Sequence, residues 1–273
     1  MTTIHPRLSI NHVSFMQEDL GDFVGHCRSL GARHVALTSP QLLEEGGLAR
    51  AKKLFGGDGL QLEAIQHRFA TPPNNLDADD GTANTTLVRL IRLAEQLGAT
   101  SIYMSAGGRG SLDWQSAADR FCQLIAPAVA EARERGVALL VETAGIMYVD
   151  TTIAHNLVDT IALIERAGIG ICLELFYCWS EGGIYELIRR AMPRCGLVQV
   201  SDYVAGDRSF PARAVPGDGA VPLAPLVASV LEAGYMGLFD IEIIGPRIDA
   251  EGHLAATTRA AQVMGSILTA LGA

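Results

Sequence analysis

The sequence predicts a single-domain α/β protein, a (β/α)8 TIM barrel that spans residues 1–273. Three observations support this fold. The length is close to the roughly 250 residues typical of one such barrel. Short runs rich in β-branched residues alternate with longer segments of helical period, which is the pattern of βαβ units in a parallel sheet. Several helical segments end at a glycine just before the next strand, and glycine can take the left-handed conformation there without steric cost.

Eight strands are expected, and no linker or low-complexity tract separates them into domains. The helical segments between them are amphipathic. In the segment 84–97, Leu87, Leu90 and Leu97 share one face while Arg89 lies elsewhere, and a threonine near its start is the expected cap. Further helices are expected at 116–135, 152–167 and 222–233, and strands at 8–10, 34–37, 61–65, 101–104, 138–142, 170–174, 197–201 and 238–243.

Composition and charge narrow the classes of partner. Apolar residues make up 49% of the chain and charged residues 19%, which is enough for a large core. The net charge is −9 and the basic residues are scattered, so the concentrated basic surface of a nucleic-acid binder is missing. No apolar run reaches the roughly 18 residues of a membrane span. We therefore expect a small-molecule substrate, with neither nucleic acid nor membrane as a partner.

Cysteine usage and the start of the chain predict a location. The five cysteines are an odd number without CxxC spacing, which argues against a disulfide scaffold or a structural zinc site. Residues 1–8 lack the apolar stretch of a secretory signal. We expect a protein of the reducing cytoplasm. The apolar helix faces leave the assembly state open, a homo-oligomer included.

Two connections are longer than an ordinary loop between a strand and a helix. They cover residues 68–81, rich in Pro, Asn and Asp, and 203–222, rich in Gly, Pro and Asp. In a barrel they would follow the third and seventh strands, on the face where active sites are built. Such loops are either functional lids or variable surface decoration.

Oxygen-bearing side chains occur at the ends of the last four expected strands. Glu142 and Glu174 each terminate an apolar run, Gln199 lies on the seventh strand, and Glu242 interrupts the eighth. A single strand-terminal Glu more often forms a salt bridge at the barrel rim. Several converging carboxylates would repel one another unless a cation neutralised them. An all-oxygen set suits Mg, Mn or a similar divalent ion, so we predict that these four residues bind one metal.

The second half of the chain resembles the xylose-isomerase-like superfamily of sugar isomerases, epimerases and related dehydratases. Its pattern is a Glu, an acidic residue, a His or Gln and a Glu on strands 5 to 8, matched here by Glu142, Glu174, Gln199 and Glu242. The stretch Val198-Gln-Val-Ser-Asp resembles the seventh strand of that superfamily, and Arg213-Ala-Val-Pro-Gly-Asp-Gly resembles a loop of ketose 3-epimerases. The resemblance implies one divalent cation (Mn, Mg or Co) and an Arg213 that contacts substrate.

Two residues depart from the superfamily pattern. Glu174 stands where the superfamily usually has Asp, and Tyr177 stands where sugar epimerases usually have a substrate-contacting His. Both changes argue against carrying over a particular sugar. Tyr177 remains a candidate contact to substrate, in a mouth that is more aromatic than a free sugar would need.

The resemblance implies a reaction at a carbon next to a carbonyl. A metal held by Glu142 and Glu242 would stabilise an enediolate, while the same two carboxylates move the proton. This describes an isomerase or epimerase of a polyhydroxylated or cyclic keto substrate. Loss of a β-hydroxyl would instead make a dehydratase, and a barrel that only binds a ligand is a further alternative. A DNA-repair endonuclease is disfavoured, because the seven histidines mostly lie away from the strand ends.

Three further side chains are weaker candidates for binding substrate. His67 follows the third strand and is either a substrate contact or an ordinary loop residue. Arg109 lies in a glycine-rich turn after the fourth strand, where it would meet an anionic group or simply belong to the turn. Asp202 would either bind substrate or orient a neighbouring group.

Overall fold

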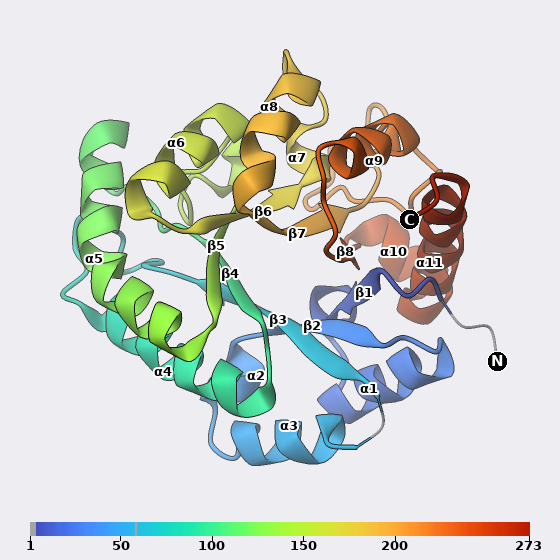
Figure 1. Ribbon diagram of the computed structural model, residues 1–273, viewed down its shortest axis with the longest axis horizontal. Coiled ribbons are helices and arrows are strands. Elements are labelled where there is room, and N and C mark those ends of the chain that lie inside the picture. The colour runs from blue at the N-terminus through green and yellow to red at the C-terminus, as the bar shows by residue number, and fades with distance from the viewer. Residues whose placement is uncertain (1–3, 58) are drawn as a thin grey trace.

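The chain folds into a closed barrel of parallel strands with helices around it (Figure 1). The computed structural model describes residues 4–57 and 59–273. The first three residues of the segment 1–8, in which the sequence predicts no secretory signal, lie outside the described residues. Within these residues, eight strands follow one another around the barrel and β1 pairs with β8 to close it. The strands are β1 (Leu8–Asn11), β2 (His34–Thr38), β3 (Gln61–Arg68), β4 (Ser101–Ser105), β5 (Ala138–Glu142), β6 (Gly170–Glu174), β7 (Cys195–Val200) and β8 (Phe239–Ile241).

The expected strands agree with the observed ones, and the differences lie at their ends. β5 and β6 end at Glu142 and Glu174 as expected. β3 continues three residues further than expected, to Arg68, which brings the start of the first long connection into the sheet. β8 is shorter than expected and stops at Ile241, so Glu242 lies just beyond the strand.

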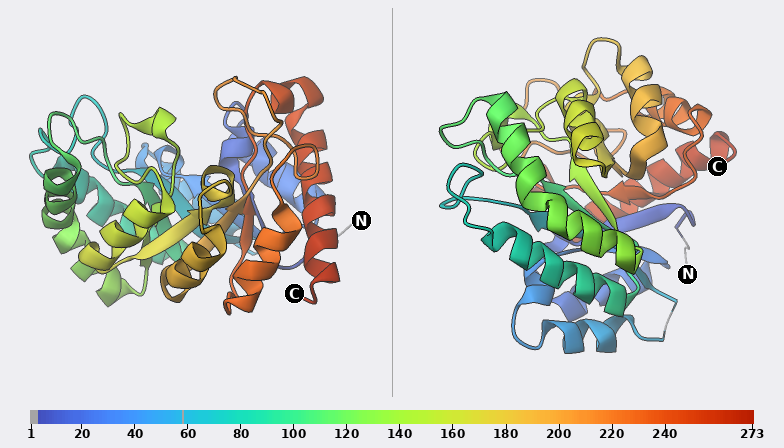
Figure 2. Two further views of the ribbon diagram at one scale, coloured as in Figure 1. Left: turned by 90° about the horizontal axis from the view of Figure 1, so that it is seen from above. Right: turned by 60° about the vertical axis from the view of Figure 1, so that its left-hand side comes forward.

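Helices form the outer layer of the barrel, and β1 and the C-terminal helix lie on the same flank (Figures 1 and 2). The C-terminal helix α11 packs against β1 and β8, where the barrel closes. The helices are η1 (His12–Phe15), α1 (Leu20–Ser29), α2 (Pro40–Leu43), α3 (Gly47–Phe55), α4 (Thr82–Leu97), α5 (Trp114–Arg135), η2 (Ile146–Tyr148), α6 (Leu157–Ala167), α7 (Leu175–Cys178), α8 (Ile184–Ala191), η3 (Met192–Arg194), α9 (Leu223–Glu232), α10 (Pro246–Glu251) and α11 (His253–Ala270).

The helices pack through the apolar faces that their sequences predict. In α4, Leu87 and Leu90 are fully buried against the sheet. This helix starts two residues earlier than expected. Its first turn is held by Asp79, whose carboxylate accepts hydrogen bonds from the N–H groups of Gly81 and Ala83, and this corrects the expectation of a threonine cap. None of the described helices is both long and apolar enough to cross a bilayer.

The barrel interior changes from apolar to polar along its axis. Small and medium side chains such as Ala36, Ala64 and Leu140 fill the middle of the barrel. Towards the ends of the strands the buried side chains become polar, with Asn11, Gln199 and others at the mouth. Since buried polar groups are stable only with hydrogen-bond partners or compensating charge, the mouth of the barrel is the place to look for a functional site.

Candidate metal centre and active site

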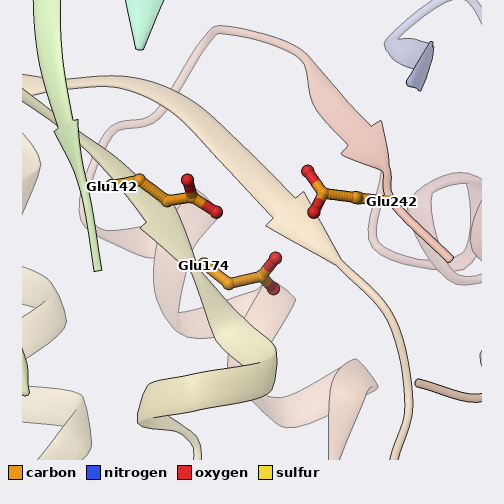
Figure 3. Close-up of side chains that lie close together, drawn as sticks. All are labelled: Glu142, Glu174 and Glu242. Carbon is orange, nitrogen blue, oxygen red and sulfur yellow. The ribbon is translucent and has the colours of Figure 1, made fainter. Parts of the chain in front are cut away.

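Three glutamates converge at the mouth of the barrel. Oxygen atoms of Glu142, Glu174 and Glu242 all lie within 4.8 Å of one another, and the carboxylates point into one shared space (Figure 3). All three residues are buried, with exposed fractions of 8%, 0% and 4%. Glu142 and Glu174 are carried by the last residues of β5 and β6, and Glu242 by the residue after β8. The three glutamates therefore converge in the structure, as the sequence predicts.

Arg213 supplies the positive charge closest to these glutamates. Its Nη1 donates to Glu174 Oε2 at 2.6 Å and to Ser201 Oγ at 2.9 Å, and its Nη2 lies 3.1 Å from Glu242 Oε1. The guanidinium carbon is 4.9 Å from the ring centre of Phe176 and 5.2 Å from that of Tyr177. The aromatic side chains after β6 therefore help to hold an arginine that is only 2% exposed.

The charges of this cluster do not balance. Besides the three glutamates, Asp240 is fully buried on β8, which gives four carboxyl groups against Arg213. Burial raises the pKa of Glu142 well above its ordinary value, and the charges of Glu242 and Glu174 raise it further. Burial also raises the pKa of Glu242 to about 7, against the opposing effect of Arg213. A cluster of this kind must either take up protons or bind a cation.

One oxygen of Glu242 is fixed by neutral donors from other strands. Asn11 Nδ2 donates to Glu242 Oε2 at 3.1 Å, the hydroxyl of Tyr103 donates to the same oxygen at 3.4 Å, and Gln199 Nε2 donates to it as well. These three side chains come from β1, β4 and β7. The carboxylate is thus held in place from one side, while its Oε1 faces Arg213.

Gln199 reaches the cluster, with its nitrogen end towards Glu242. Its Oε1 accepts a hydrogen bond from the thiol of Cys172 at 3.1 Å. To act as the metal ligand that the sequence predicts, the amide would have to turn over and present Oε1 to the carboxylates. Without a cation that orientation would bring two acceptor oxygens together, which is why the nitrogen end faces Glu242 here.

Asp240 was missed by the sequence analysis. It lies two residues before Glu242, and alternate residues of a strand point to the same face, so its position was available as a signal. Asn11 Nδ2 donates to its Oδ2 at 2.6 Å. Burial raises the pKa of Asp240 to about 6, although the amides of Asn11 and Gln199 partly offset this effect.

Asp202 organises the loop that carries Arg213. Its Oδ1 accepts from the N–H groups of Tyr203 and Val221, and its Oδ2 accepts from those of Gly217 and Gly219, all at 2.8 to 3.0 Å. A Cβ on Gly219 would lie 2.4 Å from this carboxylate, so the loop requires glycine there. Of the two roles expected for Asp202, the structure places it in the orienting one, because both oxygens are occupied by the backbone.

A cavity of about 260 Å³ opens over the carboxylates. Glu142, Glu242, Arg213 and Tyr177 line it, together with Phe210 from the second long connection. That connection is therefore part of the cavity wall. Three larger hollows, at the start of β5–β7, beside α11 and at the ends of β2 and β3, contain no carboxylate among their described lining residues. The cavity over the glutamates is therefore the one that fits a metal-dependent reaction.

The remaining candidate residues differ in whether they line this cavity. The ring of Tyr177 forms part of its wall, and burial raises the pKa of its hydroxyl. His67 is buried, contacts Ser39 Oγ at 3.0 Å and lines an adjoining cavity, and burial lowers its pKa to about 4. Arg109 is exposed and is absent from the described residues that line the cavity over the carboxylates.

Comparison with known proteins identifies the class. The family model for the xylose isomerase-like TIM barrel matches residues 24–265, and the chain belongs to this family. Protein SMc04130 from Sinorhizobium meliloti 1021 has a similar structure, with 22% identity, a TM-score of 0.80 and coverage of 97% of this chain and 98% of that chain.

Two similar structures carry more specific descriptions. An IolI protein with a bound zinc atom is 14% identical, with a TM-score of 0.82 over 97% of this chain and 98% of its own. D-psicose 3-epimerase from Clostridium cellulolyticum H10, solved with D-tagatose, is 15% identical, with a TM-score of 0.76 over the same shares. The search of curated protein sequences gives no match. At these identities the likeness establishes the fold, and the reaction must be argued from the site.

Proposed function

We propose that this chain is a divalent-metal-dependent isomerase or epimerase that moves a proton at a carbon next to a carbonyl. The substrate class is a polyhydroxylated or cyclic keto compound. The observation that carries the proposal is the convergence of Glu142, Glu174 and Glu242 within 4.8 Å at the mouth of the barrel. The D-psicose 3-epimerase of similar fold supports this class of reaction, and the IolI protein with its bound zinc atom supports a divalent metal.

The donor set suits a hard divalent cation. Three carboxylates offer only oxygen ligands, which is the preference of Mn, Mg and Co rather than of a thiolate zinc site. Gln199 would complete the set if its amide turned, and Asn11 and Tyr103 already fix one ligand oxygen. When bound, such a cation polarises a substrate carbonyl and acidifies the adjacent C–H bond.

The protein side chains would then handle the proton. Glu142 and Glu242 approach the shared space from different strands (Figure 3), so one can remove a proton from the substrate and the other can return it on a different face. Arg213 would hold a substrate oxygen next to them, since its side chain lines the same cavity.

Proton exchange with solvent tests this proposal directly. The protein is loaded with Mn²⁺ and incubated in D₂O with a panel of keto sugars and cyclic keto acids, and NMR follows the signal of the C–H group next to the carbonyl. The proposal predicts loss of that signal, or formation of the epimer, for at least one compound. A conjugated product that absorbs ultraviolet light would indicate a dehydratase instead. Bound Mn²⁺ without any exchange or product would contradict catalysis.

A further inference from the structure

Three polar side chains at the ends of β3 and β4 face the active-site cavity without a partner. Gln66, Arg68 and Ser105 all line the cavity that contains Glu142 and Glu242. Gln66 and Arg68 are alternate residues of β3 and so share a face, and Arg68 is the register partner of Ser105 on β4. The sequence analysis did not single out any of the three.

The hydrogen-bonding capacity of these side chains is unused. Ser105 Oγ is buried and has no hydrogen-bond partner among the described residues. A buried hydroxyl without a partner is unfavourable, and an oxygen of a bound ligand would supply the missing hydrogen bond. Across residues 4–57 and 59–273, the side chains of Gln66 and Arg68 make neither a hydrogen bond nor an ion pair with the protein.

Arg68 differs in this respect from most other arginines of the chain. In the described part of the chain, only Arg33, Arg68 and Arg109 lack a side-chain hydrogen bond or ion pair, and of these three Arg68 lines the cavity over the carboxylates. The ion pairs that the carboxylates of the site make are with Arg213, which contacts Glu174 and Glu242. The guanidinium of Arg68 therefore keeps its donors free for something else in the cavity.

We propose that Arg68, with Gln66 and Ser105, forms a subsite for an anionic group of the substrate. A guanidinium binds two oxygens of a carboxylate or a phosphate at once, and the amide and the hydroxyl add neutral hydrogen bonds. The inference rests on the proposed function, because it assigns the other end of the substrate to the carboxylate cluster. The substrate class becomes a small keto acid or keto phosphate. A cavity of about 260 Å³ is in keeping with a small ligand.

Three matched ketoses provide the probes for this subsite. D-Fructose, D-fructose 6-phosphate and D-fructuronate share a hydroxyketone end and differ at the sixth carbon, which is neutral, a phosphate ester or a carboxylate. Their dissociation constants are measured by calorimetry on the Mn²⁺-loaded protein and on the metal-free protein. We expect at least one anionic ketose to bind about tenfold more tightly than D-fructose, as a charge-assisted hydrogen-bonded pair allows. Comparison of D-fructose 6-phosphate with D-fructuronate shows whether the subsite prefers a phosphate or a carboxylate.

Variants at two exposed arginines separate a subsite from a general charge effect. Arg68→Gln should remove the preference for the anionic ketose, and Arg68→Lys should restore part of it. Arg109→Gln removes the same charge from the next loop, outside the described lining of the cavity, and should leave the preference intact. Both positions are exposed, so neither substitution should impair folding, and thermal unfolding checks this.

The outcomes of this experiment are distinct from those of the proposed reaction. The subsite is overturned if no ketose binds, if anionic and neutral ketoses bind equally, or if the preference survives in Arg68→Gln. The preference should persist without Mn²⁺, because Arg68 contacts none of the three glutamates. A preference that persists in a protein without Mn²⁺ binding or proton exchange would refute the reaction and retain the subsite.

Discussion

The two halves of the barrel mouth are built from different side chains. The half formed by β5–β8 carries the four carboxyl groups of the cluster, on Glu142, Glu174, Asp240 and Glu242, and the loop after β7 adds the buried Arg213. The half formed by β1–β4 ends in neutral or basic side chains, with Asn11, Tyr103, Ser105 and Arg68 facing the site. The difference indicates that the two halves have different roles. The half formed by β5–β8 would hold the cation and move the proton. The half formed by β1–β4 orients Glu242 and would recognise the rest of the substrate.

The same difference appears in the ionisation of the two halves. Burial raises the pKa of Glu242 to about 7 and that of Asp240 to about 6. In the first half, burial lowers the pKa of both His12 and His67 to about 4. Burial disfavours the charged form in every case, so near neutral pH the two histidines are uncharged while Glu242 and Asp240 lie close to their titration range.

The largest expected effect comes from removing a carboxylate of the second half. Glu142→Gln and Glu242→Gln each remove a proton-transfer group and a metal ligand, so turnover should fall by at least about 10²- to 10⁴-fold. The rate is measured in the proton-exchange assay with a compound that the wild-type protein turns over. Glu165→Gln, which removes an exposed carboxylate on α6, is the control and should leave the rate unchanged. Retained activity in either active-site variant would remove that residue from the mechanism.

Loss of Arg213 should destabilise the protein when no metal is present. Arg213→Met leaves Glu174 and Glu242 without their buried partner, and breaking a buried ion pair costs about 3–5 kcal/mol. Urea unfolding of the metal-free protein measures this loss. Mn²⁺ should stabilise the variant more than it stabilises the wild-type protein, because the cation takes over the charge compensation.

An exposed arginine provides the control for that experiment. Arg259 pairs with Asp218 and Glu251 on the surface, and Arg259→Met should cost less than about 1 kcal/mol. An equal decrease in the free energy of unfolding in the two variants would show that the buried contacts of Arg213 stabilise the protein no more than surface ion pairs do.

The pH dependence of stability should differ between wild type and Glu242→Gln. The pKa of Glu242 is raised by folding, so its contribution to stability is present below its unfolded value of about 4.5 and is lost as the pH rises through about 7. The variant Glu242→Gln does not undergo this pH-dependent loss of stability. Its unfolding free energy relative to wild type should therefore increase from about pH 4 to pH 8, by up to about 3 kcal/mol.

Two conditions sharpen this test. His12 and His67 have lowered pKa values and act in the opposite direction, but both are unchanged in the variant and cancel in the difference. Saturating Mn²⁺ should flatten the difference curve, because a bound cation keeps the carboxylate ionised. A difference that is independent of pH in the metal-free protein would contradict the raised pKa.

The smallest effect is expected for the loop that carries Arg213. Asp202→Asn replaces one acceptor oxygen by an NH₂ group, which leaves two backbone N–H groups facing a donor and costs about 1–3 kcal/mol. The loop 203–221 should become more sensitive to proteolysis, and KM should rise more than kcat falls. Asp218→Asn, in the same loop on an exposed ion pair, should change neither. Equal protease sensitivity of both variants would show that Asp202 does not hold the loop.

The fold and the carboxylate cluster could be predicted because both depend on periodic sequence signals. Eight apolar runs set the strands, and two of these runs end at Glu142 and Glu174 in the structure as in the sequence. Parallel strands bring their carboxyl ends to one edge, so the convergence of the glutamates follows from the topology. Arg213 was placed at the site by resemblance, whereas its ion pairs with Glu174 and Glu242 came only from the structure.

The rest of the site depends on contacts that the sequence does not encode locally. The nitrogen end of Gln199 faces the carboxylate of Glu242, and its oxygen end accepts a hydrogen bond from the thiol of Cys172. Which of the unpaired arginines lines the cavity depends on how the strand ends are arranged in space, and so Arg68 was overlooked while Arg109, which is absent from the described lining of the cavity, was proposed. Asp202 could be predicted as an acidic residue after β7, but the four backbone groups it binds are brought together only by the fold of its loop.

Titration of the metal-free protein with Mn²⁺, followed by electron paramagnetic resonance, tests the shared cation most directly. The geometry predicts one tightly bound Mn²⁺ per chain, with binding abolished or greatly weakened in Glu142→Gln, Glu174→Gln and Glu242→Gln and unchanged in Glu165→Gln. Absence of stoichiometric binding in the wild-type protein, or equal binding in all four variants, would contradict a common site formed by the three glutamates.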